Sequence, residues 1–361
     1  DRWFSSLPGP TQPNRLFLFS ATSHGATSHV KADLAVGYPQ KTIFDSLHDS
    51  GVDFGIYAQS LPCTLFFRGM RKLRYVPKFH KFSTFIEHAR QGKLRSLSVL
   101  EPRYFDLMGE PADDDHPAHD VANGQRLVKQ VYEAMRGSPQ WNQSFLVITY
   151  DEHGGFFDHV PTPYRDVPTP DGIPGPDPFR FAFDRLGVRV PTIMVSPWIN
   201  KGTVVSRPNG PTASSEYEHS SIPATIRKLF NLKSGFLTRR DAWAGTFEQV
   251  VAGLTSPRTD CPVVLPDVAP LRETEADENS GLSELQSEIV QLAADLHGDA
   301  ALSRLVGEAS KNMTVREASE YVGNAFASFL EAGKAALRMG VDESAVVSIW
   351  PALATKNRAA P

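Results

Sequence analysis

The sequence contains little cysteine, no surplus of basic residues and no long apolar run. Its 361 residues include two cysteines, Cys63 and Cys261, which either form one disulfide or stay free. The net charge of −4 gives no electrostatic basis for binding nucleic acid. No apolar stretch approaches the roughly 18 residues of a membrane-spanning helix. We therefore expect no nucleic-acid partner and no transmembrane segment. If the protein contacts a membrane, we expect it to bind at the membrane surface.

What is present is an ordinary globular composition in a chain long enough for a large domain with a smaller appendage. Over residues 1–255, short apolar runs alternate with segments of helical periodicity. The expected strands are Leu94–Leu100, Phe145–Tyr150 and Val188–Val195, and a helix is expected over Gly124–Met135. This alternation predicts an α/β fold in which helices cover both faces of a sheet.

The remaining residues differ in composition. Residues 256–280 are rich in proline and then acidic, which is typical of a linker. Residues 281–361 then predict a small helical region, in which leucines from Leu282 to Leu296 share one helical face. A second helix is expected after Thr314, with Glu317 at the capping-box position, through about Leu337. We expect the apolar stripe to pack on the main domain, with contact to lipid as the alternative.

Two adjacent carboxylates, Asp151 and Glu152, follow the apolar strand expected at Phe145–Tyr150. Gly154 and Gly155 come directly after them and permit a sharp turn. Ligands in α/β folds collect at the carboxyl ends of strands, and paired carboxylates suit a divalent cation. The sequence therefore favours a metal site here, over a helix cap and a solvated surface charge.

Three further segments allow two interpretations each. In DDDHPAHD, residues 113–120, the histidines either contact a phosphate or donate a proton, or they lie in an acidic loop that caps a helix near Val121 through Asp120. Thr11 lies in a proline-rich turn that leads into an expected apolar strand. It is either a turn residue without a catalytic role or a hydroxyl that attacks phosphorus if a metal lowers its pKa. His219 precedes a helix and is either a site residue or a structural histidine, the second being favoured.

Long motifs in the chain resemble those of one family. They are TQPNRLF at residues 11–17, DDHPAHDV at 114–121, TYDEHGGFFDHVPTP at 149–163, RVPTIMVSPWI at 189–199 and SSEYEHSSIPATIRKLFNL at 214–232. Together they look like the plant non-specific phospholipases C, in the bacterial phospholipase C and acid phosphatase group of phosphoesterases. The resemblance covers nearly the whole chain. It implies an alkaline-phosphatase-like α/β fold and hydrolysis of phosphatidylcholine and related phospholipids to diacylglycerol and a phosphorylated head group.

The resemblance also assigns roles to individual residues. Thr11 in TQPNR corresponds to the nucleophile, and Asp151 and Glu152 in TYDEHGG correspond to ligands of a divalent metal ion whose identity stays open. His116 in DDHP corresponds to a histidine that contacts phosphate, and His80 is a weaker candidate for another. The implied mechanism is attack by a metal-assisted threonine, followed by hydrolysis of a phosphothreonine intermediate.

The chain departs from the family pattern in one respect. Family members carry two further metal ligands, a Glu-Asn pair in a segment resembling ENRSFD, on the first strand of the sheet. This chain has no such segment. We therefore expect an N-terminally truncated chain with an incomplete metal site and an apolar surface left uncovered in the sheet.

Three functions remain open at this stage. The first is a phospholipase C at a membrane surface, and the second is an acid phosphatase acting on small monoesters. The third is a catalytically inactive, lipid-binding fragment without the Glu-Asn ligands. The resemblance suggests an endomembrane or secretory route, or a peripheral membrane location, and leaves oligomeric state and head-group preference open.

Overall fold

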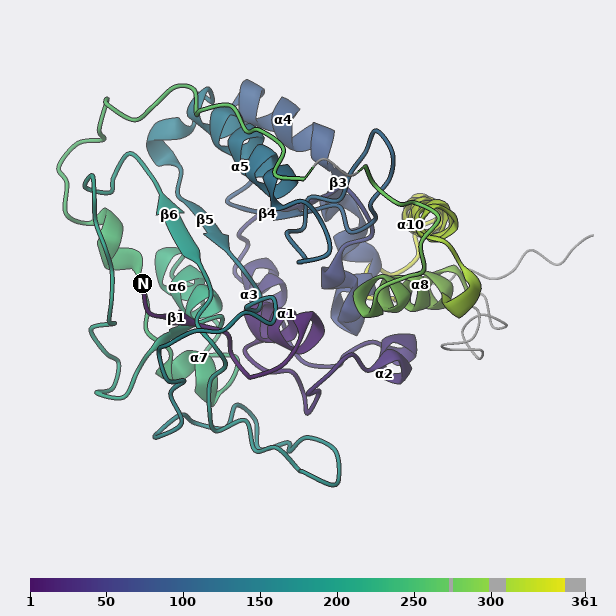
Figure 1. Ribbon diagram of the computed structural model, residues 1–361, viewed down its shortest axis with the longest axis horizontal. Coiled ribbons are helices and arrows are strands. Elements are labelled where there is room, and N and C mark those ends of the chain that lie inside the picture. The colour runs from purple at the N-terminus through teal and green to yellow at the C-terminus, as the bar shows by residue number, and fades with distance from the viewer. Residues whose placement is uncertain (273–274, 299–309, 348–361) are drawn as a thin grey trace, which may run out of the picture.

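The computed structural model describes residues 1–272, 275–298 and 310–347 of the chain (Figure 1). The described part is a mixed α/β structure in which small sheets lie among helices. The strands are β1 (Trp3–Phe4), β2 (Phe54–Ala58), β3 (Phe79–Lys81), β4 (Leu97–Glu101), β5 (Leu146–Thr149), β6 (Thr192–Val195) and β7 (Tyr217–Glu218). The helices are α1 (Thr11–Ser20), α2 (Lys31–Val36), α3 (Ile43–Asp49), α4 (Phe82–Gln91), α5 (Val121–Arg136), α6 (Ser221–Leu229), α7 (Arg239–Trp243), α8 (Glu284–His297) and α10 (Val315–Arg338).

In place of the expected single sheet, the described strands form three small sheets. The first has the order β3-β2-β4 with parallel strands, and Ile56 pairs with both Phe79 and Val99. The second joins β5 and β6 in antiparallel fashion, and the third joins β1 and β7 in parallel. Within the described chain, β4 pairs only with β2 and β5 only with β6, so each leaves one edge unpaired.

The relative direction of β4 and β5 follows from side-chain contacts at both of their ends. Before the strands, Leu94 N–H donates to Oε1 of Gln140 at 2.8 Å, and Nε2 of Gln140 donates back to the Leu94 carbonyl at 3.2 Å. After the strands, Arg15 contacts both Glu101 and Asp151. Since both the beginnings and the ends of the two strands lie together, β4 and β5 run parallel.

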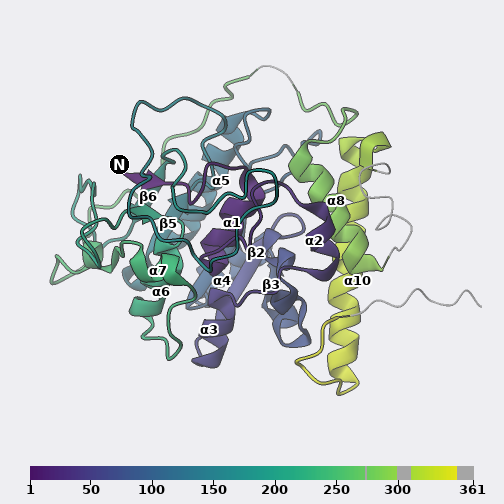
Figure 2. The same cartoon turned by 90° about the horizontal axis from the view of Figure 1, so that it is seen from below.

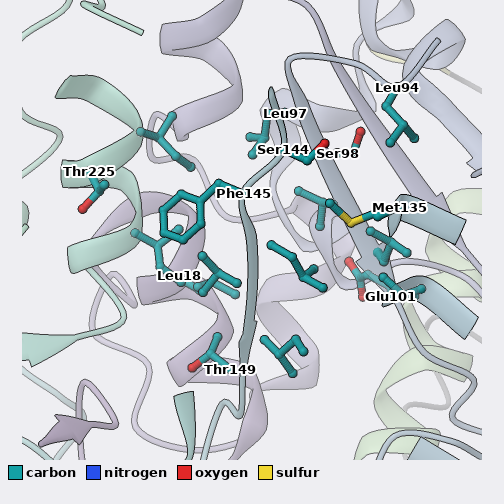
Figure 3. Close-up of a pocket in the computed structure, with 18 of the residues that line it drawn as sticks. Leu18, Leu94, Leu97, Ser98, Glu101, Met135, Ser144, Phe145, Thr149 and Thr225 are labelled. Carbon is teal, nitrogen blue, oxygen red and sulfur yellow. The ribbon is translucent and has the colours of Figure 1, made fainter. Parts of the chain in front are cut away.

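A cavity of about 990 Å³ separates these two parallel strands. Figure 3 shows Leu18, Leu97, Met135 and Phe145 around it. Helices α4 and α5 pack on each other, and α1, α3 and α6 form a second group (Figure 1). Both groups contribute apolar lining, and the residues of β4 and β5 that line the cavity are mostly only half-buried. The apolar surface of the sheet is thus incompletely covered at this point.

Local sequence signals explain most helix boundaries. Asp120 caps α5 by accepting from Ala122 N–H at 3.0 Å, and Thr314 forms a capping box with Glu317 at the start of α10, as expected. The expectation for the segment after Thr11 is wrong, because residues 11–20 form α1 and no strand. This helix is buried around most of its circumference, so its apolar residues form a run that resembles a strand. Pro13 is tolerated because it lies in the first turn.

Helices α8 and α10 lie side by side at one end of the molecule (Figure 2). Their buried residues, among them Ile289 and Phe329, belong to the same hydrophobic cluster as Phe44 and Phe54 of the α/β part. The apolar stripe of α8 therefore packs on the main body, as expected. Residues 256–272 follow α5 closely, since Lys129 and Tyr132 donate to the carbonyl oxygens of Leu265 and Pro262. No helix among the described residues is long and apolar enough to cross a bilayer.

Candidate active site

Thr11 is the first residue of α1 and is 7% exposed. The preceding residue, Pro10, is extended and provides no side-chain cap, so the first N–H groups of the helix have no such acceptor. Asn14 fixes the approach to the helix by donating from Nδ2 to the Gly9 carbonyl at 2.8 Å. An uncapped helix N-terminus attracts anions through its N–H groups and its dipole. Thr11 is therefore placed where a phosphate group can be bound.

Arg15 lies one turn after Thr11, on the same face of α1. Its Nε donates to Oδ2 of Asp151 at 2.7 Å, and its other end lies 3.5 Å from Oε2 of Glu101. The guanidinium also donates to the hydroxyl of Tyr104 and stacks 5.2 Å from the centre of that ring. These contacts fix a positive charge close to the nucleophile candidate. Arg15 is not among the site residues that the sequence predicts, although its spacing of four residues from Thr11 is a usable signal.

Asp151 and Glu152 lie in the turn that follows β5. Oδ1 of Asp151 accepts from Glu152 N–H at 2.9 Å, and Oε2 of Glu152 accepts from Gly154 N–H at 2.7 Å. Gly154 adopts a φ of 66°, a conformation that disfavours side chains with a Cβ. His219 is 1% exposed and holds this turn from behind, since its Nε2 bonds to the Asp151 carbonyl at 2.7 Å. Burial lowers the pKa of His219, which favours its neutral form.

His116 belongs to the loop before α5. Its Nδ1 accepts from Ala118 N–H at 3.4 Å, and its ring centre lies 5.8 Å from that of His119. His119 in turn bonds through Nδ1 to Oδ1 of Asp114 at 2.6 Å. Burial pushes the pKa of His119 down, but the hydrogen bond and charge of Asp114 outweigh it and raise the pKa overall. The loop thus combines a phosphate-binding histidine candidate with a second histidine that is anchored.

One cavity of about 640 Å³ brings most of the expected site together. It is lined by Thr11, Arg15, His116, Asp151 and Glu152, among other residues. Four of the five candidate residues from the sequence therefore share one cavity, and Arg15 joins them. Such a concave site with a few convergent polar groups is the usual form of a catalytic pocket.

His80, the fifth candidate, lies elsewhere. It is in β3, where its ring stacks on Tyr57 at 5.1 Å and lies 5.5 Å from His88. It does not line the cavity. Burial and the neighbouring His88 lower its pKa to about 4. At neutral pH His80 is therefore uncharged and packed among aromatic side chains.

Asp158 lines the same cavity, whereas the neighbouring His159 does not. Asp158 accepts two hydrogen bonds from Arg189, at 2.7 and 2.8 Å, and this pairing lowers the pKa of Asp158 to about 2. The His159 side chain is 83% exposed. Asp158 therefore anchors the loop after β5 to the strand region that carries Arg189.

The donor chemistry at Asp151 and Glu152 suits a divalent cation only in part. Both supply hard carboxylate oxygens, but Arg15 already occupies Oδ2 of Asp151. Among the described residues, no group of three or more His, Cys, Asp or Glu side chains is arranged to hold a metal ion. The described residues therefore do not complete a metal site by themselves.

Comparison with known proteins gives the family of the chain. The model of the phosphoesterase family matches residues 1–233, which include Thr11, His116, Asp151 and Glu152. The chain is 66% identical over 357 residues to non-specific phospholipase C6 of Arabidopsis thaliana, covering 99% of this chain and 69% of that protein. It is 58% identical over 359 residues to non-specific phospholipase C1 of the same plant, covering 99% and 67%.

A bacterial relative is more distant. Phospholipase C B of Mycobacterium tuberculosis is 28% identical over 280 residues, covering 68% of this chain and 51% of that protein. The chain spans about two thirds of the length of the two plant relatives. Because the family model matches well over half of the sequence, the chain belongs to the phosphoesterase family, whose reaction is the hydrolysis of phosphoric esters.

Proposed function

We propose that the chain is a phospholipase C that acts on phosphatidylcholine and related phospholipids at a membrane surface. It cleaves the bond between phosphorus and the glycerol oxygen, which yields diacylglycerol and a phosphorylated head group. The observation that carries this proposal is the position of Thr11 at the uncapped start of α1, in one cavity with Arg15 and His116. The names of the plant and bacterial relatives supply the substrate class.

In the first step, the Thr11 hydroxyl oxygen forms a bond to phosphorus. Glu152, which lines the same cavity, accepts the hydroxyl proton. The helix N–H groups and the charge of Arg15 stabilise the negative charge that builds up on the phosphoryl oxygens. The bond from phosphorus to the glycerol oxygen breaks, and His116 donates a proton to the departing oxygen.

In the second step, water replaces Thr11 on phosphorus. Neutral His116 takes a proton from the water, and the attacking oxygen displaces the threonine oxygen. Thr11 regains a proton from Glu152, and the phosphorylated head group leaves. The cycle therefore restores each of the three side chains to its starting protonation state.

The proposal also includes a divalent ion at the site and an alkaline-phosphatase-like sheet. Asp151 and Glu152 would supply two of the oxygen ligands of such an ion, which would act as a Lewis acid when bound. No step above depends on it, because the described residues do not complete the site. The parallel course of β4 and β5, with one cavity between them, supports an alkaline-phosphatase-like sheet that is open at this position.

The test is the release of diacylglycerol from phosphatidylcholine. Thr11→Ala is expected to abolish release, and the matched control Thr203→Ala, at an exposed position outside the cavity, is expected to leave it intact. Turnover of small monoesters with no gain on micellar lipid would instead assign an acid phosphatase. The incomplete metal site favours one other candidate, a non-catalytic lipid-binding protein. This candidate predicts that the unmodified chain and Thr11→Ala both bind lipid without turnover.

A further inference from the structure

Exposed apolar side chains surround the mouth of the catalytic cavity. Five large apolar residues that line this cavity are at the same time exposed, by 36 to 94%. They are Val121, Tyr150, Phe156, Phe157 and Ile193. We refer to these five residues as the apolar rim.

The apolar rim is assembled from three separate segments. Val121 begins α5, Tyr150, Phe156 and Phe157 follow β5, and Ile193 belongs to β6. The turn at Gly154 and Gly155, with φ values of 66° and 76°, presents the two phenylalanines. A Cβ placed on Gly155 would meet no atom within 4 Å, so the turn is open to solvent at this position, whereas a Cβ on Gly154 would lie 3.0 Å from the Pro117 ring. Exposed apolar residues that are scattered singly need no explanation, but these five come from three segments and line one cavity. This grouping indicates a contact surface.

The strongest feature of the apolar rim is Phe157, which is 94% exposed. An exposed aromatic ring forgoes the burial energy that makes phenylalanine a core residue, and such residues often mark a contact surface. A phospholipid in a bilayer holds its phosphorus just outside the acyl boundary. An enzyme that reaches this phosphorus must therefore bring the mouth of its site into the interfacial layer, where aromatic and aliphatic side chains are stable.

Charge indicates which lipid surface fits. Two arginines line the cavity, and Arg15 is paired with Asp151, while the chain as a whole carries a charge of −4. Arg189, which lines the same cavity, is paired with Asp158. Among the described residues, the cavity lining therefore offers no unpaired arginine or lysine that would attract an anionic membrane, and a zwitterionic surface needs none. Binding through the apolar rim should also depend little on salt, unlike binding through a basic patch.

We propose that the apolar rim enters the interfacial layer of a zwitterionic phospholipid surface and holds the cavity against it. The inference rests on the proposed function for the orientation of the substrate. It adds the surface through which the chain meets lipid and the type of lipid that this surface selects.

The experiment measures binding to phosphatidylcholine vesicles by co-sedimentation. Phe157→Ser should weaken binding about tenfold, as expected when one largely buried aromatic contact is lost. The matched control is Phe179→Ser, because Phe179 is 91% exposed, lies in the same long loop region and does not line the cavity. The control should bind like the unmodified chain. Raising the salt concentration about tenfold should change the affinity of the unmodified chain by less than about twofold.

A second measurement does not depend on turnover. Phe157→Trp in the Thr11→Ala background should show tryptophan fluorescence that is quenched by vesicles with brominated acyl chains, whereas Phe179→Trp should gain no such quenching. Equal vesicle binding by Phe157→Ser and Phe179→Ser would overturn the inference. So would the absence of any vesicle binding, or a dimer in solution that Phe157→Ser dissociates, since a second copy would then cover the apolar rim.

The two proposals fail in different ways. Vesicle binding that depends on Phe157, without release of diacylglycerol from any phosphatidylcholine, would support the inference and contradict the proposed function. Release of diacylglycerol from monomeric short-chain phosphatidylcholine, with vesicle binding unchanged in Phe157→Ser, would support the function and contradict the inference.

Discussion

Arg15 donates from Nε to Oδ2 of Asp151 at 2.7 Å, and this contact joins α1 to the end of β5 across 136 positions of sequence. The same guanidinium reaches Glu101 at the end of β4. Arg15 therefore links the carboxyl ends of the two parallel strands on either side of the 990 Å³ cavity. It also brings the candidate nucleophile Thr11 and the carboxylate Asp151 to one site.

Replacing Arg15 should destabilise the fold. The side chains of Arg15 and Asp151 are only 15% and 20% exposed, so Arg15→Met leaves a largely buried carboxylate without its partner. The expected loss is about 3 kcal/mol in the free energy of unfolding, measured with urea. Lys41→Met is the control, because its pair with Asp49 is half exposed and should contribute less than about 1 kcal/mol. Equal losses in the two variants would show that Arg15 does not have this linking role.

Divalent cations should bind weakly to the chain. Asp151 is already neutralised by Arg15, and the described residues hold no cluster of three metal-binding side chains. Titration calorimetry with Zn²⁺ or Mg²⁺ should give dissociation constants of roughly 10⁻⁴ M or weaker, the range of sites with few ligands. Whatever binding is present should decrease in Asp151→Asn. A tight site with submicromolar affinity would contradict this description of the donor set.

His80 should make the stability of the fold depend on pH. Burial lowers its pKa to about 4, whereas the unfolded chain has the ordinary value near 6.5. Between about pH 6.5 and 4, His80 is therefore protonated in the unfolded chain and neutral in the folded chain. This contribution lowers stability as the pH falls from about 6.5 to 4 and is absent above that window. His80→Phe should flatten that part of the curve of unfolding free energy against pH. An unchanged slope would show that His80 titrates normally in the fold.

The two cysteines should behave differently toward thiol reagents. Both are free thiols in the structure, so Cys63 and Cys261 do not form the disulfide that the sequence leaves open. Cys63 is 1% exposed and burial raises its pKa, whereas Cys261 is partly exposed. Titration of the folded chain should label Cys261 quickly and Cys63 only after unfolding. Labelling of neither thiol after unfolding without a reductant would indicate that a disulfide had formed.

Much of the architecture follows from signals that are local in sequence. The cap at Asp120 and the capping box of Thr314 and Glu317 are read from a few adjacent residues, because the bonds they make are local. The apolar runs that became β4 and β5 were identified to within a few residues for the same reason.

Other features depend on the tertiary fold and could not be predicted in this way. The sequence of α1 predicts a strand because burial on most sides of the helix removes the helical periodicity of its apolar residues. The role of Arg15 depends on Glu101 and Asp151, which are distant in sequence. Motif resemblance proposed His80 as a site residue, but only the fold shows that it packs beside Tyr57, away from the cavity. The division of the strands among three small sheets is likewise a property of the folded chain.

The most direct test of the account is to identify the residue that becomes covalently bound to phosphorus. The chain is mixed with phosphatidylcholine that carries a radiolabelled choline group, quenched in acid after a few turnovers, digested and analysed by mass spectrometry. The account predicts a phosphocholine group on Thr11 and neither label nor diacylglycerol release in Thr11→Ala. Label on a different residue, or undiminished diacylglycerol release by Thr11→Ala, would contradict it.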